Sequence, residues 1–547
     1  MSEKIKPLHI IVLLCLSSII LTWANHIWIK NNLSHLPITW DPSNYAYMTL
    51  FEYKTLHNGG LLQFLRTVQT QAPALAPLFP VTGVPFLFLF GLDLNNIYLA
   101  NGIYLFILLT SVFFIAERIS GRTAAIVASF SVATFPGIIA FSRDYFFEFP
   151  SAAMTALVYM FLLKTDSFRN KRASVLFGIA SALSLLTKTM GIVFLTVPFL
   201  YAFYIFARKR TPWTIRKHVL YAFLSFSLVA GIYYIPNFKA IFGYLFFYGV
   251  GKGAARYSAG LSNMLSIQYW TYYVSPIIHK GISPGYLLIF VLSATAFLIS
   301  SGARKLSRDY WIVLLWLVCG YVLLSIPSNK VGERYALPIL PPIAIMMAAH
   351  ITRISMRPLK VLIIGLAFLI GIVNYAYQTF AEGCNYERYF LKSTRIALLE
   401  PVHVSCNMQR GLMIDSSKDW SLLPMLKYMD DNSQHYKSVN VLVAVDHNFL
   451  NNYGLRLYAL WGELKGILKS EFTFDTAAFR PYSEDEIKQL LAKRQFIIVK
   501  TDYQGPGDTN EYNGVIKNLL KKEKPLKSFD MSDGSTVSIY SSIIGTR

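Results

Sequence analysis

Long apolar runs dominate this sequence and decide what it can fold into. Each is about 17 to 21 residues long, and a helix of that length crosses the hydrocarbon core of a bilayer. Backbone groups in lipid must hydrogen-bond within their own segment, so each spanning run is expected to be helical. A single water-soluble domain is excluded, because 54% of the 547 residues are hydrophobic. The sequence predicts about eleven spans, at 9–29, 95–116, 123–141, 147–164, 173–187, 189–207, 218–236, 284–301, 310–326, 335–351 and 359–379.

The first apolar run has two interpretations. Lys4 and Lys6 precede it, as in a cleaved signal peptide. The run is long enough to span, however, and Lys30-Asn31-Asn32 lacks a small-residue cleavage pattern. We therefore predict an uncleaved first helix.

The charge pattern predicts orientation. The net charge is +21, but the Lys and Arg residues lie in short clusters between apolar runs, which argues against nucleic-acid binding. Placing the N-terminus in the cytoplasm puts most of these clusters in inside loops, as the positive-inside rule requires. The clusters are Arg118/Arg122, Lys164 to Arg172, Arg208 to Lys217, Arg304 to Arg308 and Arg353 to Lys360. We predict an integral protein of the plasma (inner) membrane, surrounded by membrane lipids, with its C-terminal domain extracytoplasmic.

This topology leaves two long outside loops. The loop at 30–94 mixes aromatic and aliphatic residues with polar ones, which predicts amphipathic helices along the membrane surface. The loop at 237–283 places Lys252 and Arg256 among glycines, beside an aromatic stretch from Tyr269 to Tyr273. We expect this second loop to be flexible and to close over a substrate.

The composition divides the chain into two domains: a transmembrane domain at 1–380 and an α/β domain at 381–547. In the second domain, strand-like runs at 411–415, 439–445, 496–500 and 537–542 alternate with helical patterns at 421–430, 451–461, 483–493 and 511–522. Cys384 and Cys406 pair only if their compartment is oxidising, and spacing leaves that open.

Asp41 is the first candidate for chemistry. It follows the first span in Thr39-Trp40-Asp41-Pro42, where a carboxylate flanked by aromatic residues is suited to deprotonate an acceptor hydroxyl. The structural alternative is a helix N-cap, since Asp before Pro is a good helix start.

Other ionisable residues gather in the outside turns. Arg143, Asp144 and Glu148 lie in one turn; in a helical turn the two carboxylates would share a face, either for a joint role or for an ion pair with Arg143. Lys188 is a lone cation between two spans, suited to bind phosphate or to snorkel. A further turn carries Lys330, Arg334 and Tyr335. Cations converging with carboxylates on one face suit a phosphate leaving group together with a base.

Four motifs in register resemble the C-type (GT-C) integral membrane glycosyltransferases. They are Asp41 after the first span, the acidic turn before the fourth, Leu186-Thr187-Lys188-Thr189-Met190-Gly191, and the Lys-x-x-x-Arg-Tyr-x-Leu-Pro-x-x-Pro-Pro run from Lys330 to Pro342. Within that superfamily the sequence is most similar to the protein O-mannosyltransferase and lipid A aminoarabinose transferase group. The likeness covers about residues 1–380.

The resemblance implies inverting transfer of a sugar from a polyprenyl-phosphate donor to a lipid, glycan or protein acceptor. It implies that Asp41 is the catalytic acidic residue, with Glu148 or Asp144 as the second. It places Lys188, Lys330, Arg334 and Tyr335 at the lipid phosphate, and the predicted donor-binding set also includes Lys252, Arg256 and Arg143. Two departures leave the sugar open: Pro42 follows Asp41 where relatives often have a second acid, and Gln71-Ala72-Pro73-Ala74 replaces a Lys before Pro-Pro.

Two other function classes are alternatives to a glycosyltransferase. A transporter or lipid flippase would place ionisable residues at mid-bilayer, whereas these spans are nearly free of charge. Alternatively, the C-terminal domain is the binding module, with Asp446-His447-Asn448 after a strand as its site. No His or Cys cluster with metal-ligand spacing accompanies the candidate residues, so the sequence predicts no metal or other cofactor.

Overall fold

Helices carry most of the chain. The computed structural model describes residues 7–34, 36–249, 251, 253–254, 258, 260–261, 263–299, 306–327, 329–330, 332–380, 389–391, 396–399, 420–433, 437–476, 483–502 and 507–541. The chain divides into two compact units. The bundle unit comprises Met1–His26, Val68–Phe79 and Tyr98–Val404, and the second unit comprises Ile27–Thr67, Pro80–Ile97 and Ser405–Arg547.

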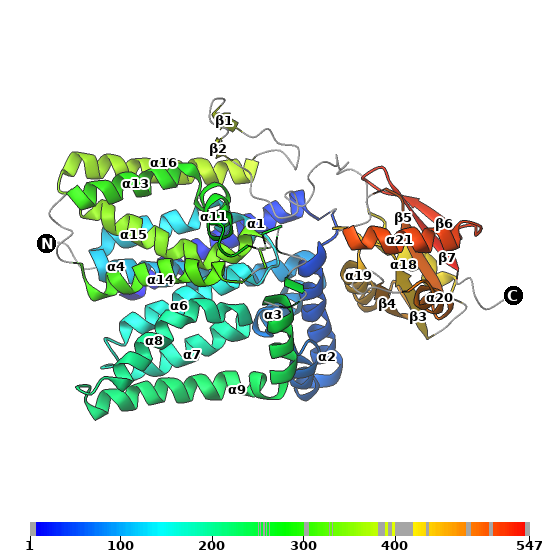
Figure 1. Cartoon of the computed structure of the whole chain (residues 1–547), viewed down its shortest axis with the longest axis horizontal. Coiled ribbons are helices and arrows are strands. Elements are labelled where there is room, and N and C mark those ends of the chain that lie inside the picture. The colour runs from blue at the N-terminus through cyan, green and yellow to red at the C-terminus, as the bar shows by residue number, and fades with distance from the viewer. Residues whose placement is uncertain are drawn as a thin grey trace. The chain divides into compact units, whose positions relative to one another are not determined.

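The long helices of the bundle unit lie side by side (Figure 1). They are α1 (Pro7–Asn32), α4 (Asn101–Ala133), α6 (Glu148–Lys164), α7 (Lys171–Thr187), α8 (Ile192–Ala207), α9 (Trp213–Gly249), α13 (Pro284–Ile299), α14 (Arg308–Ser325), α15 (Leu340–Thr352) and α16 (Arg357–Phe380). Shorter elements join them: η1 (Leu94–Ala100), α5 (Pro136–Ser142), η2 (Thr189–Gly191), α11 (Ile267–Thr271), α12 (Val274–Pro276), the π-helix η3 (Ile277–Ile282) and the 3₁₀ helix η5 (Glu333–Ile339). The strands β1 (Tyr389–Leu391) and β2 (Ile396–Leu399) pair antiparallel.

Every predicted span is largely helical, although 123–141 crosses the break at Thr134 and Phe135 between α4 and α5. By length and composition, seven of the described helices can cross a membrane, or eight if the bent pair Ile267–Ile282 and Pro284–Ile299 forms one span. Two further predicted spans are α6 and α7, which have 17 residues each. The remaining one is the second half of α4. The fold class, a polytopic helical membrane protein with an α/β domain, is therefore confirmed.

Helix α4 is a hairpin of two helices. Its backbone leaves helical geometry at Ser120 and Gly121, where Gly121 has a φ of 81° that favours glycine. The Ser129 hydroxyl donates to the Leu109 carbonyl at 3.4 Å. In a straight helix these residues would be about 30 Å apart, so the chain reverses at Gly121. The sequence also predicted two spans here, because Arg118 and Arg122 interrupt the apolar run.

The second predicted loop differs from expectation. Helix α9 does not end near residue 236 but continues past Pro236 to Gly249, and α11, α12 and η3 occupy most of 267–282. The continuation is apolar, since Phe238, Phe242 and Phe246 recur every four residues along one exposed stripe. Such a stripe is suited to contact lipid, which explains why the helix continues past the predicted end of the span.

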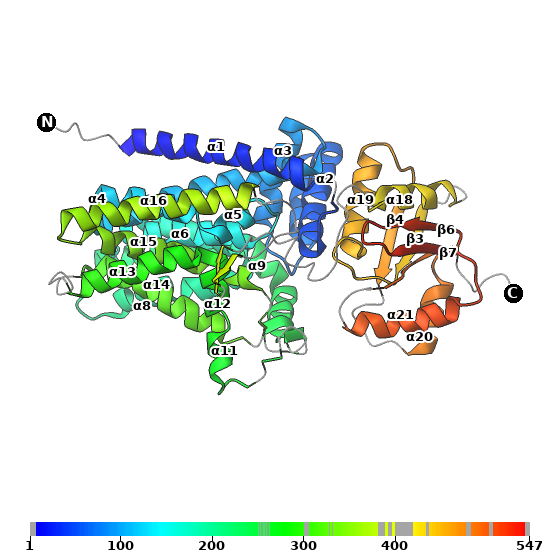
Figure 2. The same ribbon diagram turned by 90° about the horizontal axis from the view of Figure 1, so that it is seen from above.

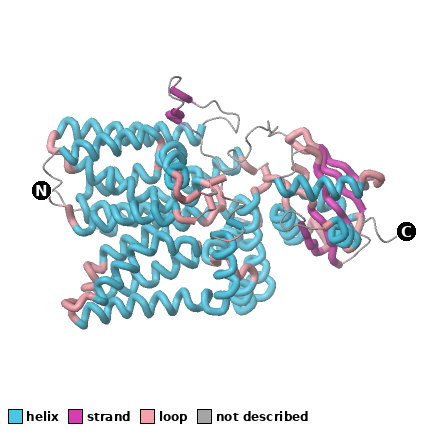
Figure 3. The backbone as a smooth tube through the Cα atoms, in the orientation of Figure 1, coloured by secondary structure: helices cyan, strands magenta, loops and turns pink. Residues whose placement is uncertain are grey.

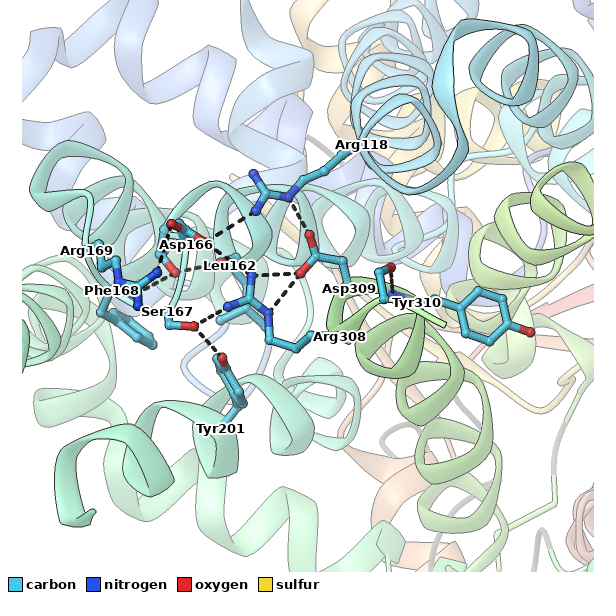
Figure 4. A network of polar contacts seen from close by, with 12 residues as sticks. Arg118, Leu162, Asp166, Ser167, Phe168, Arg169, Tyr201, Arg308, Asp309 and Tyr310 are labelled. Carbon is cyan, nitrogen blue, oxygen red and sulfur yellow. Dashed lines mark hydrogen bonds and ion pairs between the residues drawn. The ribbon is translucent and has the colours of Figure 1, made fainter. Parts of the chain in front are cut away.

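Charged side chains fasten one end of the bundle. Figure 4 shows Asp166 and Asp309 set between Arg118, Arg169 and Arg308. Arg118 Nε lies 2.5 Å from Asp309, and Arg308 Nη2 lies 2.8 Å from the same carboxylate. The network joins the α4 hairpin, the α6–α7 turn and the start of α14. All five residues belong to loops predicted to be cytoplasmic.

In the second unit, the five-stranded sheet has the order β4-β3-β5-β7-β6. Strands β4 (Glu471–Thr476), β3 (Ser438–Val443) and β5 (Phe496–Lys500) are parallel, and β7 (Thr536–Ser541) runs antiparallel to both β5 and β6 (Lys527–Asp530). Helices cover both faces: α18 (Leu422–Asp431) and α19 (Asn452–Leu464) on one, α20 (Glu484–Ala492) and α21 (Gly507–Leu520) on the other (Figures 2 and 3).

The strand pattern explains the two covered faces. Val439, Val441 and Val443 pack with α18 and α19, whereas Leu442 and Ala444 pack with α20 and α21. Alternate residues of a strand point to opposite faces, so a continuous apolar run needs helices on both sides.

The first outside loop is helical, and much of it belongs to the second unit. Helix α2 (Trp40–Thr70) is broken at Gly60, which has a φ of 71°, and α3 (Leu78–Phe90) follows. Helices in this stretch were predicted from the sequence. Their placement along a membrane surface stays a prediction.

Candidate functional site

Glu148 is the centre of a buried charge cluster in the bundle unit. It is the first residue of α6 and is 3% exposed. A carboxylate there is favoured by the positive end of the helix dipole. Its Oε1 lies 2.8 Å from Lys188 Nζ and 3.1 Å from Arg334 Nε. One carboxylate oxygen thus holds two cations that come from separate turns.

Aromatic rings line these cations. Lys188 Nζ lies 4.6 Å from the centroid of the Tyr335 ring, and the Arg334 guanidinium lies 4.5 Å from that of Phe146. Lys188 has extended backbone between α7 and η2, which brings its side chain out of the helix ends toward Glu148. Both cations are therefore oriented on one side by a carboxylate and on the other by ring faces.

Asp144 adds a second buried carboxyl. It lies in the turn before α6, where its Oδ1 accepts a hydrogen bond from the Tyr145 backbone N–H at 2.7 Å. Burial raises the pKa of Asp144 to about 7, and the Arg334 charge opposes that rise. The turn is not helical, so Asp144 and Glu148 do not share a helix face as the sequence suggested. Their charges nevertheless interact, which places both at one cluster.

Two carboxyl oxygens stand out within this cluster. Glu148 Oε2 and Asp144 Oδ2 are buried and accept no hydrogen bond from the protein atoms of the described residues. Buried polar atoms nearly always have a partner. These two oxygens are therefore suited to accept a hydrogen bond from a hydroxyl group of a ligand or from water.

Lys330 occupies an aromatic cage. Its side chain is fully buried, and its Nζ donates to the Ser325 carbonyl at 2.5 Å. The same nitrogen lies 3.8 Å from the Tyr269 ring centroid and 5.7 Å from that of Tyr273. Burial lowers the pKa of Lys330 to about 8. Burial alone accounts for this shift, with no carboxylate of the described residues opposing it, so the charge of Lys330 is not neutralised by an ion pair there.

The cage and the Glu148 cluster are at the same end of the bundle. Helix η5, which carries Arg334 and Tyr335, packs against both α6 and η3. Glu148 begins α6, and the 17 residues of that helix span about 25 Å, which separates it from the network of Figure 4. Among the described residues of this cluster, three cations face one paired carboxylate and one carboxyl of raised pKa. The excess of positive charge makes this end of the bundle suited to bind an anion.

Sequence reasoning named these charged residues but not all of their partners. It noted the stretch from Tyr269 to Tyr273 only as part of a mobile loop, and it gave Phe146 no role. The signal for the cage was the run of tyrosines itself, since tyrosine rings near a lone lysine suit cation–π contact.

Arg143 has a structural role in this arrangement. It is 1% exposed and donates to the Asn25 side chain, the Gln378 carbonyl and the Thr379 hydroxyl at 2.7 to 2.8 Å. These bonds tie the α5–α6 turn to α1 and α16. The predicted role of Arg143 in donor binding, like its predicted ion pair with the acids of its own turn, stays a prediction.

Asp41 belongs to the second unit. It lies inside the first turn of α2, one residue past the start of the helix, and is partly exposed. The N-cap position precedes Trp40, so Asp41 is not the cap itself, although its charge suits a helix N-terminus. Its catalytic role stays a prediction.

Other predicted residues lie outside the described part. Lys252, Arg256, Cys384 and Cys406 are among them, so the roles of the basic loop and of the two cysteines stay predictions. In the described part of the chain, no group of three or more His, Cys, Asp or Glu residues is placed to hold a metal ion.

Apolar helices long enough to cross a membrane, followed by an α/β domain, define this chain as an integral membrane protein. Residues 76–235 match the family model described as dolichyl-phosphate-mannose-protein mannosyltransferase. That range includes Asp144, Glu148 and Lys188 but neither Asp41 nor Lys330. No curated protein matches the sequence.

Solved structures support the same fold. The chain is similar to ArnT from Cupriavidus metallidurans bound to undecaprenyl phosphate, with a TM-score of 0.58 and 13% identity over 99% of this chain and 100% of that one. It is also similar to the arabinofuranosyltransferase AftD from Mycobacteria, with a TM-score of 0.55 and 13% identity, covering 100% of this chain and 40% of that one. The predicted resemblance to the GT-C superfamily is thereby confirmed at the level of the fold.

Proposed function

We propose that this protein is a membrane glycosyltransferase that moves a sugar from a polyprenyl-phosphate donor to an acceptor at the extracytoplasmic face, with inversion. The proposal rests on the charge of this cluster. Lys188, Lys330 and Arg334 supply three positive charges, and the paired Glu148 carboxylate supplies one negative charge. The fold supports it, since the similar ArnT structure contains undecaprenyl phosphate.

In this proposal the cations hold the lipid phosphate. Lys188 and Arg334 exchange part of their contact with Glu148 for phosphate oxygens, Lys330 adds a further charge, and Tyr335 packs beside the group. The phosphate leaves with the electron pair of the breaking sugar C–O bond, and fixed cations stabilise the charge that develops on it. Because the cluster is buried, little water competes for these contacts.

The acceptor oxygen forms the new bond to the anomeric carbon from the opposite side. Asp41 takes the proton of the acceptor hydroxyl, which is the role the sequence suggests for it. Asp144 and Glu148 offer buried oxygens that can bind hydroxyl groups of the sugar or the acceptor. The proposal keeps the predicted orientation, with the N-terminus in the cytoplasm and the C-terminal domain outside.

The test is transfer of label. Purified wild-type protein is incubated with radiolabelled polyprenyl-phosphate sugars and membrane extract, and a covalently labelled acceptor is the expected product. A transporter or flippase would move the lipid between leaflets of a vesicle and form no such product. We expect Asp41→Asn to lower the rate about a hundredfold or more while the protein still folds, as expected when a general base is lost. Unchanged transfer by that variant would remove Asp41 from the catalytic role.

A further inference from the structure

Side chains of the C-terminal domain contact α2, the helix that carries Asp41. Within the second unit, three contacts join α2 to α19 and to the loop between β3 and α19. The Trp40 indole N–H donates to Asp446 Oδ1 at 3.0 Å, the Arg456 guanidinium lies 4.6 Å from the centroid of the Tyr47 ring, and Lys54 Nζ lies 2.5 Å from Glu463 Oε1.

These contacts use a single face of α2. Trp40, Tyr47 and Lys54 recur at seven-residue intervals, which keeps them on one side of a helix. Asp41 is turned by about 100° from Trp40 in a regular helix, so it lies beside this face and is not buried within it. The contacts therefore hold the helix on a face next to the one that carries Asp41.

The loop that carries Asp446 is held in place by its own hydrogen bonds. Asp446 is 8% exposed and follows β3, and the next residue, His447, exchanges two backbone hydrogen bonds with Leu450. The Asn451 side chain donates to the His447 and Asn448 carbonyls and accepts from the Gly454 N–H, so it caps α19. A hydrogen-bond acceptor on such a loop can hold its donor in one position.

A second buried network supports the same loop. His447 Nε2 lies 3.9 Å from Asp533 Oδ2, and Lys500 Nζ lies 2.9 Å from the same oxygen. The loop after β3 is thus anchored to the end of β5 and to the β6–β7 hairpin. Displacing Asp446 would require this network to move with it.

From this arrangement we infer that the C-terminal domain positions the first turn of α2, and with it Asp41, through the hydrogen bond from Trp40 to Asp446. The inference rests on the proposed function, in which Asp41 is the base. Asp446 is a positioning residue: it acts on Asp41 through Trp40 and the helix backbone. The domain thereby contributes to the rate of transfer without contributing a catalytic group.

The kinetic test uses full-length protein and four variants. We expect Asp446→Ala and Trp40→Phe each to lower kcat at least about tenfold with the donor KM little changed, because a misplaced base slows the chemical step. Asp446→Asn keeps the acceptor oxygen and should retain kcat within about twofold. The double variant Trp40→Phe/Asp446→Ala should be no slower than either single one, as expected when both remove one interaction.

Glu463→Gln is the matched control. It weakens a contact on the same helix face, but at a partly exposed ion pair two heptads from Trp40, and such pairs contribute little. We expect its kcat to equal that of the wild type. An unchanged kcat in Asp446→Ala, or an equal loss in Glu463→Gln, would overturn the inference.

Hydrogen exchange separates this inference from the proposed function. In Asp446→Ala and Trp40→Phe, amides at 40–50 should exchange faster, and in Asp446→Asn they should not. If wild-type protein transfers no sugar, the proposed function fails, and exchange alone decides whether Asp446 holds α2. Unchanged exchange in all three variants would overturn the inference whatever the activity.

Discussion

The charge of Lys330 provides a pH-dependent test of the proposed phosphate site. Its pKa is lowered to about 8, so the fraction of charged side chains falls from about nine-tenths at pH 7 to about one-tenth at pH 9. If only the charged form binds phosphate well, the Kd for polyprenyl phosphate rises about tenfold over this range. The sign follows from the direction of the shift, because a lysine with a lowered pKa loses its charge earlier as the pH rises.

The assay is equilibrium binding of labelled polyprenyl phosphate to detergent-solubilised protein at pH 7 and pH 9. The phosphate group titrates as well, so the quantity compared is the ratio of the wild-type Kd to that of Lys330→Arg at each pH. Arginine keeps its charge at both values, and phosphate titration affects both proteins equally. We expect the ratio to rise about tenfold. A ratio that does not change between the two pH values would show that Lys330 does not contact the phosphate.

Three further predictions concern stability in detergent. Asp144→Asn should raise the apparent Tm at pH 8 more than at pH 5, because burial raises the pKa of this carboxyl from 3.8 to about 7, and the stability contributed by its protonated form is lost as the pH rises between those two values; equal shifts at both pH values would contradict this. Glu148→Gln should cost about 3 to 5 kcal/mol, since it removes the buried carboxylate that two partly buried cations share; a Tm within error of the wild type would refute it. Gly178→Ala should cost about 1 to 3 kcal/mol, because a Cβ there would lie 2.0 Å from the Ala222 carbonyl oxygen, whereas Gly365→Ala meets no atom within 4 Å and is the control; an equal Tm for the two variants would contradict the packing of α7 on α9.

Sequence reasoning placed the helices well because their signals are local. A bilayer fixes the length of an apolar run, and basic clusters mark its ends. The strand predicted at 496–500 coincides with β5, where a buried apolar run has no competing pattern. β4 and β6 were missed, since both are edge strands with polar, exposed residues and neither forms an apolar run.

The candidate site was predictable in its residue types but not in its contacts. Lys188, Lys330 and Arg334 stood out because charges beside apolar spans are costly. Nothing local showed that Glu148 pairs with two of them, or that Arg143, adjacent to Asp144, instead bridges α1 and α16. Those differences depend on where side chains from separate helices meet.

By itself, the sequence determined that this chain enters a membrane, where most of its apolar helices lie, and that an α/β domain follows them, because hydrophobic length and periodicity act within each segment. Only the tertiary structure decided which charges share a partner and that Asp446 reaches Trp40 across 406 positions of the chain. A hydrogen bond between such distant residues forms only once packing has brought both into place, so no local pattern records it.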